Sequence, residues 1–332
     1  SKHSIEKQTA HYVDCFTTVS EITNNECREL LDKPADVVLM NGFEDDFVPK
    51  GATFTGKRKR ARSTMLRVAN CLLGEDLGDD TLIIGTSGRY EFKNKGIDVF
   101  LESLNRLNRD KDLKKKVLAF VNVPSWVGDP REDLQKRLKS KDKFTEPLQC
   151  PFITHWLHNM THDQVLDMLK YLGMGNRPED KVKVIFVPCY QDGHDGILNK
   201  HYYDLILGED LSVYPSYYEP WGYTPLESVA FRVPTITTDL AGFGLWVNSL
   251  KNQHGINDGV EVLHRSDYNY SEVADGIKDT VALFSTKTEA EIKEIRKRAG
   301  QVAEQALWKH FIQYYYEAYD IALRNAMKRQ LK

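Results

Sequence analysis

Little in this 332-residue sequence marks a secreted, metal-binding or membrane-spanning protein. It has five cysteines and no C-x-x-C spacing, so it predicts neither a disulfide framework nor a zinc or redox motif. No apolar run approaches the roughly 18 residues of a membrane span, and the polar opening SKHSIEK lacks a signal-peptide pattern. We therefore expect a cytoplasmic protein with reduced thiols, no membrane partner and no metal or other cofactor.

An excess of charge of one sign is also missing. The chain has 45 Lys and Arg against 48 Asp and Glu, for a formal net charge of -3. This balance argues against nucleic acid as a partner, because bulk electrostatics would not hold it. The basic run KRKRAR at residues 57–62 falls on an expected amphipathic helix and is more typical of a solvated helix face. Any anion must therefore be bound locally, by a few residues.

What the sequence does have is the composition of a globular α/β protein. Hydrophobic residues make up 41% and charged residues 28%, and the length suits one large domain or two modest ones. The chain has no initiator Met and opens in what reads as the middle of an element. We therefore expect it to be a fragment of a longer protein.

Apolar runs and helical stretches alternate along most of the chain. After a first short run at residues 36–41, strands are expected at residues 81–86, 116–123, 182–187, 211–215, 233–237 and 259–263, with helices between most of them and helices from residue 269 to the end. This alternation predicts a doubly wound, Rossmann-like parallel sheet with C-terminal helices. Residues 125–175 contain no convincing strand and are expected to form a helical insertion, which could serve oligomerisation.

Ligands of such sheets lie where strands lead into helices, and the segment at residues 214–227, YPSYYEPWGYTPLE, is such a loop. Thr224 is expected to cap the following helix, with Pro225 at its first position and Glu227 completing a capping box. The backbone N–H groups of Tyr223 and Thr224 at the helix N-terminus favour an anion, and Gly222 permits close approach. Glu227 could serve only as a cap.

Glu219 precedes this anion site on an aromatic-rich loop and is the first catalytic candidate. A second strand-to-helix loop, GRYEFKNKG at residues 88–96, carries Arg89 and Lys95 close to a helix start, where cations oppose the helix dipole unless an anion is bound. A guanidinium fork and an ammonium would suit a diphosphate. Taken alone, these charges could also be solvated surface groups.

Three long segments of the sequence resemble those of a known protein family. GRYEFKNKG at residues 88–96, YPSYYEPWGYTPLES at residues 214–228 and VPTITTDLAGFG at residues 233–244 are similar to signature segments of eukaryotic-type glycogen synthases, and Glu219 and Glu227 match the E-x7-E pair of that family. The opening SKHSIEKQTAHYVDCFTTVSEIT resembles the stretch before the family's interdomain crossing. The likeness covers most of the chain.

The resemblance implies the C-terminal half of a twin-Rossmann GT-B enzyme that transfers glucose from UDP-glucose to the 4-hydroxyl of an α-1,4-glucan with retention. Glu219 would then contact the donor glucose, and Arg89 and Lys95 would neutralise the departing diphosphate without a metal. Glu227 would hold the ribose hydroxyls and Tyr223 would lie against the uracil. Nucleotide contacts are also expected at Thr224 and Gly222 and at Trp221.

The same likeness implies a division of the chain into three segments. Residues 1–47 would be the end of an N-terminal Rossmann-like domain, residues 48–305 the nucleotide-sugar-binding domain, and residues 306–332 a helix crossing back to the first domain. The family's glycine-rich acceptor-side loop has no counterpart, so the fragment is expected to bind UDP without extending a glucan. In full-length form we expect a homo-oligomer.

Other interpretations stay open at this point. The fold also suits a sucrose- or trehalose-type synthase, a sugar-nucleotide epimerase, or a non-catalytic glucan-binding scaffold. DGHDG at residues 192–196 could suggest a metal site, although a polar turn fits its spacing better. His155, His158 and His162 are more typical of surface or packing residues.

Overall fold

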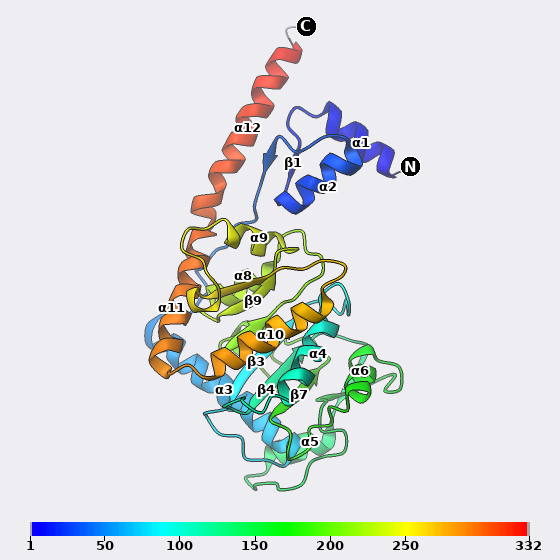
Figure 1. Cartoon of the computed structure of the whole chain (residues 1–332), viewed down its shortest axis with the longest axis vertical. Helices are drawn as coiled ribbons and strands as arrows, with labels where there is room; N and C mark the ends of the chain where they lie inside the picture. Colours follow the sequence, from blue (N-terminus) through cyan, green and yellow to red (C-terminus); the bar gives the residue numbers. More distant parts are fainter. Residues whose placement is uncertain (1, 331–332) are drawn as a thin grey trace.

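A six-stranded parallel sheet forms the centre of the computed structural model, which describes residues 2–330 (Figure 1). Its strands are β3 (Leu82–Ser87), β4 (Val117–Asn122), β7 (Val182–Val187), β8 (Leu211–Val213), β9 (Thr235–Thr238) and β10 (Val260–Leu263). They lie in the order β10-β9-β8-β3-β4-β7, and every adjacent pair is parallel. The predicted doubly wound sheet is confirmed, and each of its six expected strands overlaps an observed one.

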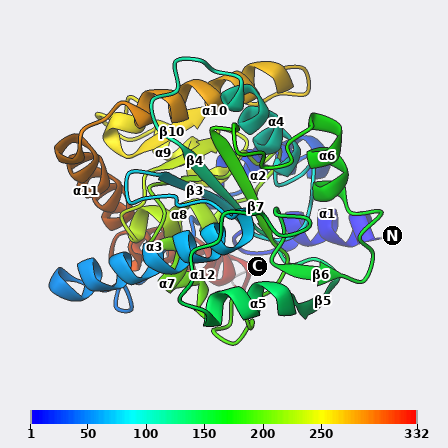
Figure 2. The same cartoon turned by 90° about the horizontal axis from the view of Figure 1, so that it is seen from below.

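Helices cover both faces of this sheet, which is why its strands are nearly continuous apolar runs. Successive strand side chains point to opposite faces. Ile84 packs in the core beneath α4 (Ile97–Asn108), α6 (Gln164–Leu172) and α10 (Tyr270–Ser285). Its neighbour Ile83 packs in the core beneath α3 (Gly51–Leu73), α5 (Glu132–Lys139) and α7 (Tyr202–Ile206). Figure 2 shows α4 and α10 on one side of the sheet and α3 and α5 on the other.

A third core region lies at the β9–β10 end of the sheet. It joins α8 (Tyr223–Ala230), α9 (Gly242–Asn248), α11 (Glu289–Gln305) and the start of α12 (Trp308–Gln330), and the 3-10 helix Ile256–Asp258 lies beside α11. Phe243 on α9 and Phe311 on α12 are both buried there. The C-terminal helix is thus anchored in the main body before it extends away.

The N-terminal residues form a separate small unit. It comprises α1 (Lys2–Tyr12), β1 (Thr17–Thr18), α2 (Glu21–Leu31) and β2 (Val37–Val38), and β1 and β2 pair in their own two-stranded parallel sheet. Ser20 caps α2 through a reciprocal capping box with Thr23. The strand expected at residues 36–41 is much shorter in the structure, where it comprises only β2. Strand β1 was not predicted from the sequence.

Helix α12 runs from the main body to this N-terminal unit (Figure 1). Asn325 Nδ2 donates to the Asp14 carbonyl oxygen at 2.8 Å, and Arg329 pairs with the Asp14 carboxylate at 2.8 Å. Tyr316 and Tyr319 remain exposed on the helix. Within residues 2–330, no helix combines the length and the apolar character needed to cross a membrane.

Residues 125–175 contain the two helices α5 and α6, as expected, and also a strand pair that the sequence did not reveal. Strands β5 (Val127–Pro130) and β6 (His155–Leu157) pair antiparallel. They are too short and too polar to give a clear alternating pattern. The segment does not project from the sheet as an excursion, because Ile153, Leu157 and Leu169 belong to its main core.

Candidate functional site

The strand order defines where a ligand would bind. From β3 the chain builds the sheet outward through β4 and β7, and from β8 it builds in the opposite direction through β9 and β10. The reversal falls between the neighbouring strands β3 and β8, and open α/β sheets bind ligands at the carboxyl ends of the strands beside such a switch point. The loops at residues 88–96 and 214–222, singled out from the sequence, follow these two strands.

These two loops are in direct contact. The backbone N–H of Tyr217 donates to the carbonyl oxygen of Asn94 at 2.8 Å. Gly96, at the start of α4, has φ +67°, and a Cβ atom there would lie 2.0 Å from the carbonyl oxygen of Pro215. A side chain at position 96 would therefore force the loops apart, so glycine is required for their close approach.

The contact brings the first catalytic candidates together. The Lys95 ammonium forms a salt bridge with Glu219 Oε2, and the two side chains are only 15% and 18% exposed. The backbone of Glu219 is fixed as well, since its N–H donates to the Leu240 carbonyl and its carbonyl accepts from the N–H of Gly242, both at 3.0 Å. The structure thus holds a carboxylate and an ammonium as a largely buried pair at the switch point.

Arg89 differs from Lys95 in its surroundings. Its side chain is 74% exposed, and its Nε donates to Glu91 at 2.9 Å. The next residue is anchored, because the Tyr90 hydroxyl donates to Asp163 at 2.7 Å and accepts from the N–H of Val165 at 2.9 Å. Arg89 therefore extends from a fixed backbone with its charge in contact with solvent.

A cavity of about 360 Å³ adjoins these loops. It lies at the carboxyl ends of β3, β4 and β7, and its lining includes Arg89, Tyr90, Asn122, Tyr190, Tyr202 and Thr224. This volume lies in the range of small-molecule sites, and the lining combines aromatic rings with a few polar groups, as such sites usually do.

Helix α8 begins differently from the expectation. Gly222, with φ +106°, is its N-cap residue, the helix starts at Tyr223, and no side chain caps it. The predicted capping box of Thr224 and Glu227 is therefore wrong, because the left-handed glycine turns the chain into the helix two residues earlier. The N–H groups of the first turn are left without a side-chain cap, which suits an anion.

Glu227 lies one helical turn after Tyr223 and Thr224, on the same face of α8. Its Oε1 accepts a hydrogen bond from the Tyr203 hydroxyl at 2.8 Å. Burial raises the pKa of the Glu227 carboxyl, and the Tyr203 hydrogen bond partly counteracts that rise. Tyr223 itself is 46% exposed.

The side chain of Trp221 does not line this cavity. It is 3% exposed and packs edge-on against Phe243 and Phe311, at centroid distances of 6.2 and 6.1 Å. The ring therefore lies in the core, and the expected nucleotide contact at Trp221 stays a prediction. From the sequence, a tryptophan beside an anion-binding glycine could not be distinguished from a packing residue.

Sequence reasoning missed several residues that the fold brings to this region. Tyr202 lines the cavity, and Tyr203 contacts Glu227. Asn122 ends β4 and Tyr190 follows β7, so both could have been anticipated from the strand-end rule used for the other loops. No motif marks Tyr203, because its partner lies 24 residues further along the chain.

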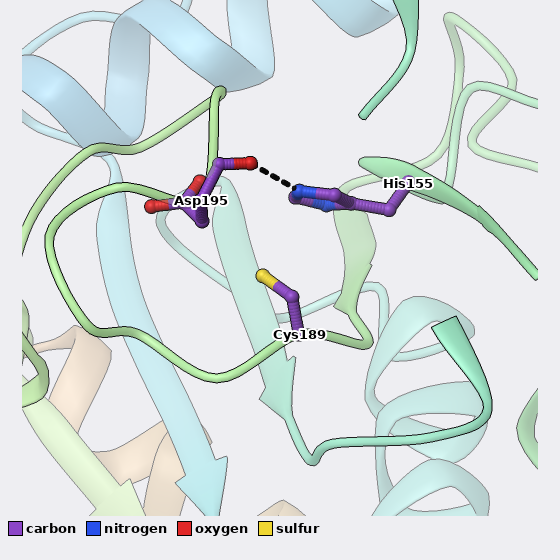
Figure 3. Close-up of side chains that lie close together, drawn as sticks. All are labelled: His155, Cys189 and Asp195. Carbon is purple, nitrogen blue, oxygen red and sulfur yellow. Dashed lines mark hydrogen bonds between the residues drawn. The ribbon is translucent and has the colours of Figure 1, made fainter. Parts of the chain in front are cut away.

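A cluster beside the cavity brings together His155, Cys189 and Asp195 (Figure 3). The imidazole is hydrogen-bonded on both sides, to the Thr154 hydroxyl at 2.9 Å and the Asp195 carbonyl oxygen at 2.7 Å. The Asp195 carboxylate accepts from three backbone N–H groups of the turn that follows. Burial raises the pKa of the Cys189 thiol to about 12. These bonds fit a polar turn rather than a set of free metal ligands.

Solved structures share this fold. A sucrose-phosphate synthase from Thermosynechococcus elongatus has a TM-score of 0.53 at 17% identity, over 99% of this chain and 61% of that one. Anabaena HepE, solved in complex with UDP and glucose, has a TM-score of 0.53 at 15% identity, over 94% and 63%. The fold, with loops meeting at its switch point, is that of the GT-B glycosyltransferases.

The sequence comparisons are more specific. The family model described as Glycogen synthase matches residues 1–136 and 129–332. Glycogen [starch] synthase of Neurospora crassa is 28% identical over 98% of this chain and 54% of its own length, and isoform 2 of Saccharomyces cerevisiae is 29% identical over 100% and 56%. The chain belongs to the glycogen synthase family and spans about half the length of these curated relatives.

Proposed function

We propose that this chain is the nucleotide-sugar-binding half of a cytoplasmic glycogen synthase, which transfers glucose from UDP-glucose to the non-reducing 4-hydroxyl of an α-1,4-glucan with retention. The observation that carries the proposal is the contact of the two switch-point loops, which sets Lys95 against Glu219, while Arg89 and Thr224 at the uncapped start of α8 line the adjoining cavity. A carboxylate, two cations and free N–H groups are the groups that a sugar diphosphate would need.

Each group has a chemical task in this reaction. The Glu219 carboxylate would face the anomeric carbon, where positive charge develops as the glycosidic bond to the diphosphate breaks. Lys95 touches Glu219 and could move between that carboxylate and the β-phosphate. Arg89, whose charge is exposed, could close onto the diphosphate with its planar fork. Leaving-group charge would then be neutralised by protein cations.

The nucleoside would occupy the cavity of about 360 Å³. Its aromatic lining offers faces for a pyrimidine, while the first-turn N–H groups of Tyr223 and Thr224, made accessible by Gly222, would hold phosphate oxygens. Glu227, on the same face of α8, would accept hydrogen bonds from the ribose hydroxyls. Tyr223 would pack at the edge of the bound nucleoside.

The test is calorimetric titration of residues 1–332 with UDP. We expect binding, and we expect Arg89→Ala and Lys95→Ala each to weaken it by roughly 10- to 100-fold, since a charge-assisted hydrogen bond contributes about 1.5–3 kcal/mol. Lys143→Ala is the matched control, because Lys143 is an exposed lysine that is bonded to Asp76 at 2.7 Å and does not line the cavity. If the chain does not bind UDP, or if all three variants bind equally well, the assignment of this site is wrong.

The transfer reaction needs a separate assay. Incubating the full-length protein with UDP-glucose and oligomaltose, and then analysing the products, would distinguish glucan extension from sucrose- or trehalose-type synthesis. We expect longer α-1,4-glucans. The same assay on residues 1–332 alone should give no extension, because the family's acceptor-side loop has no counterpart in this sequence. Extension at the full rate by residues 1–332 would overturn that domain assignment.

A further inference from the structure

The Glu227 carboxylate has an unusual partner for a half-buried acid. No salt bridge to it is found within residues 2–330, and its one hydrogen bond there comes from the neutral hydroxyl of Tyr203, at 2.8 Å from Oε1. Oε2 has no protein partner in the same part of the chain. The phenol therefore fixes one oxygen and leaves the other available for a ligand.

Packing aims the Tyr203 hydroxyl. The ring stacks on Phe231, with centroids 5.2 Å apart and planes at 4°, and Phe47 packs against it at 5.0 Å. Phe231 is the C-cap residue of α8, the helix that carries Glu227. Because the ring and the carboxylate are tied to the same helix, the position of the hydroxyl relative to Glu227 is set by rigid contacts.

The position of Glu227 makes this arrangement relevant to the ligand. Thr224, one turn earlier on the same helix face, lines the cavity, and so does Tyr202, the residue next to Tyr203. A lysine or arginine in place of the phenol would donate to both carboxylate oxygens and neutralise them. A tyrosine orients the group while keeping its charge and one oxygen for an incoming hydroxyl.

We infer that Tyr203 is a positioning residue that orients the Glu227 carboxylate toward the ribose hydroxyls of the bound nucleotide. The inference rests on the proposed function and deepens it, since it adds a residue that selects for an intact ribose. The alternative is that Tyr203 only packs in the cluster with Phe47 and Phe231. The two are separable, because Tyr203→Phe keeps the ring and removes only the hydroxyl.

The test compares UDP with 2′,3′-dideoxy-UDP, which lacks the hydroxyls, in calorimetric titrations of residues 1–332. We expect wild-type protein to prefer UDP, and Tyr203→Phe to weaken UDP binding about five- to tenfold while leaving dideoxy-UDP unchanged. Tyr218→Phe is the matched control, because it removes another phenol-to-glutamate bond, to Glu26 at 2.6 Å. The Tyr218→Phe variant should have the same ratio of affinities for UDP and 2′,3′-dideoxy-UDP as the wild-type protein. Circular dichroism would verify that both variants fold.

A second readout is the pH below which the affinity for UDP-glucose falls, as the Glu227 carboxylate becomes protonated. Loss of the phenol should move that decline to higher pH, because the hydrogen bond from Tyr203 favours the ionised carboxylate.

Equal loss of affinity for both nucleotides in Tyr203→Phe, or no loss for either, would overturn the inference and leave the proposed function intact. A wild-type protein that binds no UDP, or binds both nucleotides equally, would overturn the proposed roles of the site and this inference together.

Discussion

Glu219 and Glu227 lie eight residues apart on one strand-to-helix segment, yet their environments differ. Glu219 is on the loop, with its backbone fixed by hydrogen bonds on both sides and its carboxylate paired with a lysine from the neighbouring loop. Glu227 is on the helix, half-buried, and bonded to a neutral phenol. Burial raises the pKa of Glu227, whereas the charge of Glu219 is compensated by Lys95.

The difference shows how one segment can serve two chemical tasks. A carboxylate that must respond to charge developing on a sugar is best held ionised beside a cation that can move to the leaving group. A carboxylate that must recognise hydroxyl groups needs orientation and a free oxygen more than a counter-ion. The loop supplies the first environment and the helix the second.

The largest expected effect comes from removing the charge of Glu219. In the full-length protein, Glu219→Gln should reduce glucose transfer about 10²- to 10³-fold, because electrostatic stabilisation of the transition state is lost. UDP affinity should be unchanged or higher, because the Lys95 ammonium would no longer be shared with a carboxylate. Initial rates and calorimetry on the same preparation would check both.

Glu227→Gln is the matched variant for that experiment. We expect it to weaken UDP binding more than Glu219→Gln does and to reduce turnover less. Equal losses of rate and affinity in the two variants would remove the distinction between the glutamates.

The next effect concerns the loop contact that places Lys95 against Glu219. Gly96→Ala introduces a left-handed alanine and a Cβ atom 2.0 Å from the Pro215 carbonyl oxygen. Gly173→Ala is the control, because Gly173 has a similar φ of +70° but no atom within 4 Å of the added Cβ. We expect Gly173→Ala to lower the free energy of unfolding by about 1–2 kcal/mol, from backbone strain. Gly96→Ala should lower it by about 1–3 kcal/mol more.

Urea unfolding of both glycine variants would measure this difference. Gly96→Ala should also lose UDP affinity, whereas Gly173→Ala should keep it, since Gly173 lies at the end of α6. Identical unfolding curves for the two variants would show that the loop contact tolerates a side chain.

The sheet could be predicted from sequence because buried parallel strands are runs such as LIIGTS and VKVIFV, whose apolar character is local information. The two loops could be found because strand ends, glycines and charges stand together in the chain. The strand pair β5 and β6 could not, because strands this short carry no periodic signal.

The partners of the site residues were the least predictable part. Lys95 and Glu219 are 124 residues apart, and Tyr203 meets Glu227 only because the fold brings the Tyr203 side chain of α7 against α8. Local rules also misplaced the start of α8, because the left-handed conformation of Gly222 outweighed the Thr-Pro capping pattern. Similarly, burial of Trp221 depends on Phe243 and Phe311, which come from two other helices.

The smallest expected effect is on the pH dependence of nucleotide binding, and it tests the Glu227 half of the comparison. Ribose hydroxyls donate more strongly to a carboxylate than to a protonated acid, by roughly 1 kcal/mol, so binding favours the ionised form. Because burial raises the pKa of Glu227, affinity should fall as the pH drops through that raised value, which lies above the range of an exposed glutamate. UDP-glucose is the suitable ligand, since its diphosphate diester has no group titrating near neutral pH. We expect a decline of about fivefold in wild-type protein and a flat profile in Glu227→Gln, measured by calorimetry from neutral to mildly acidic pH. Parallel profiles in the two proteins would show that Glu227 is not the titrating group, and the contrast with Glu219 would then concern charge compensation alone.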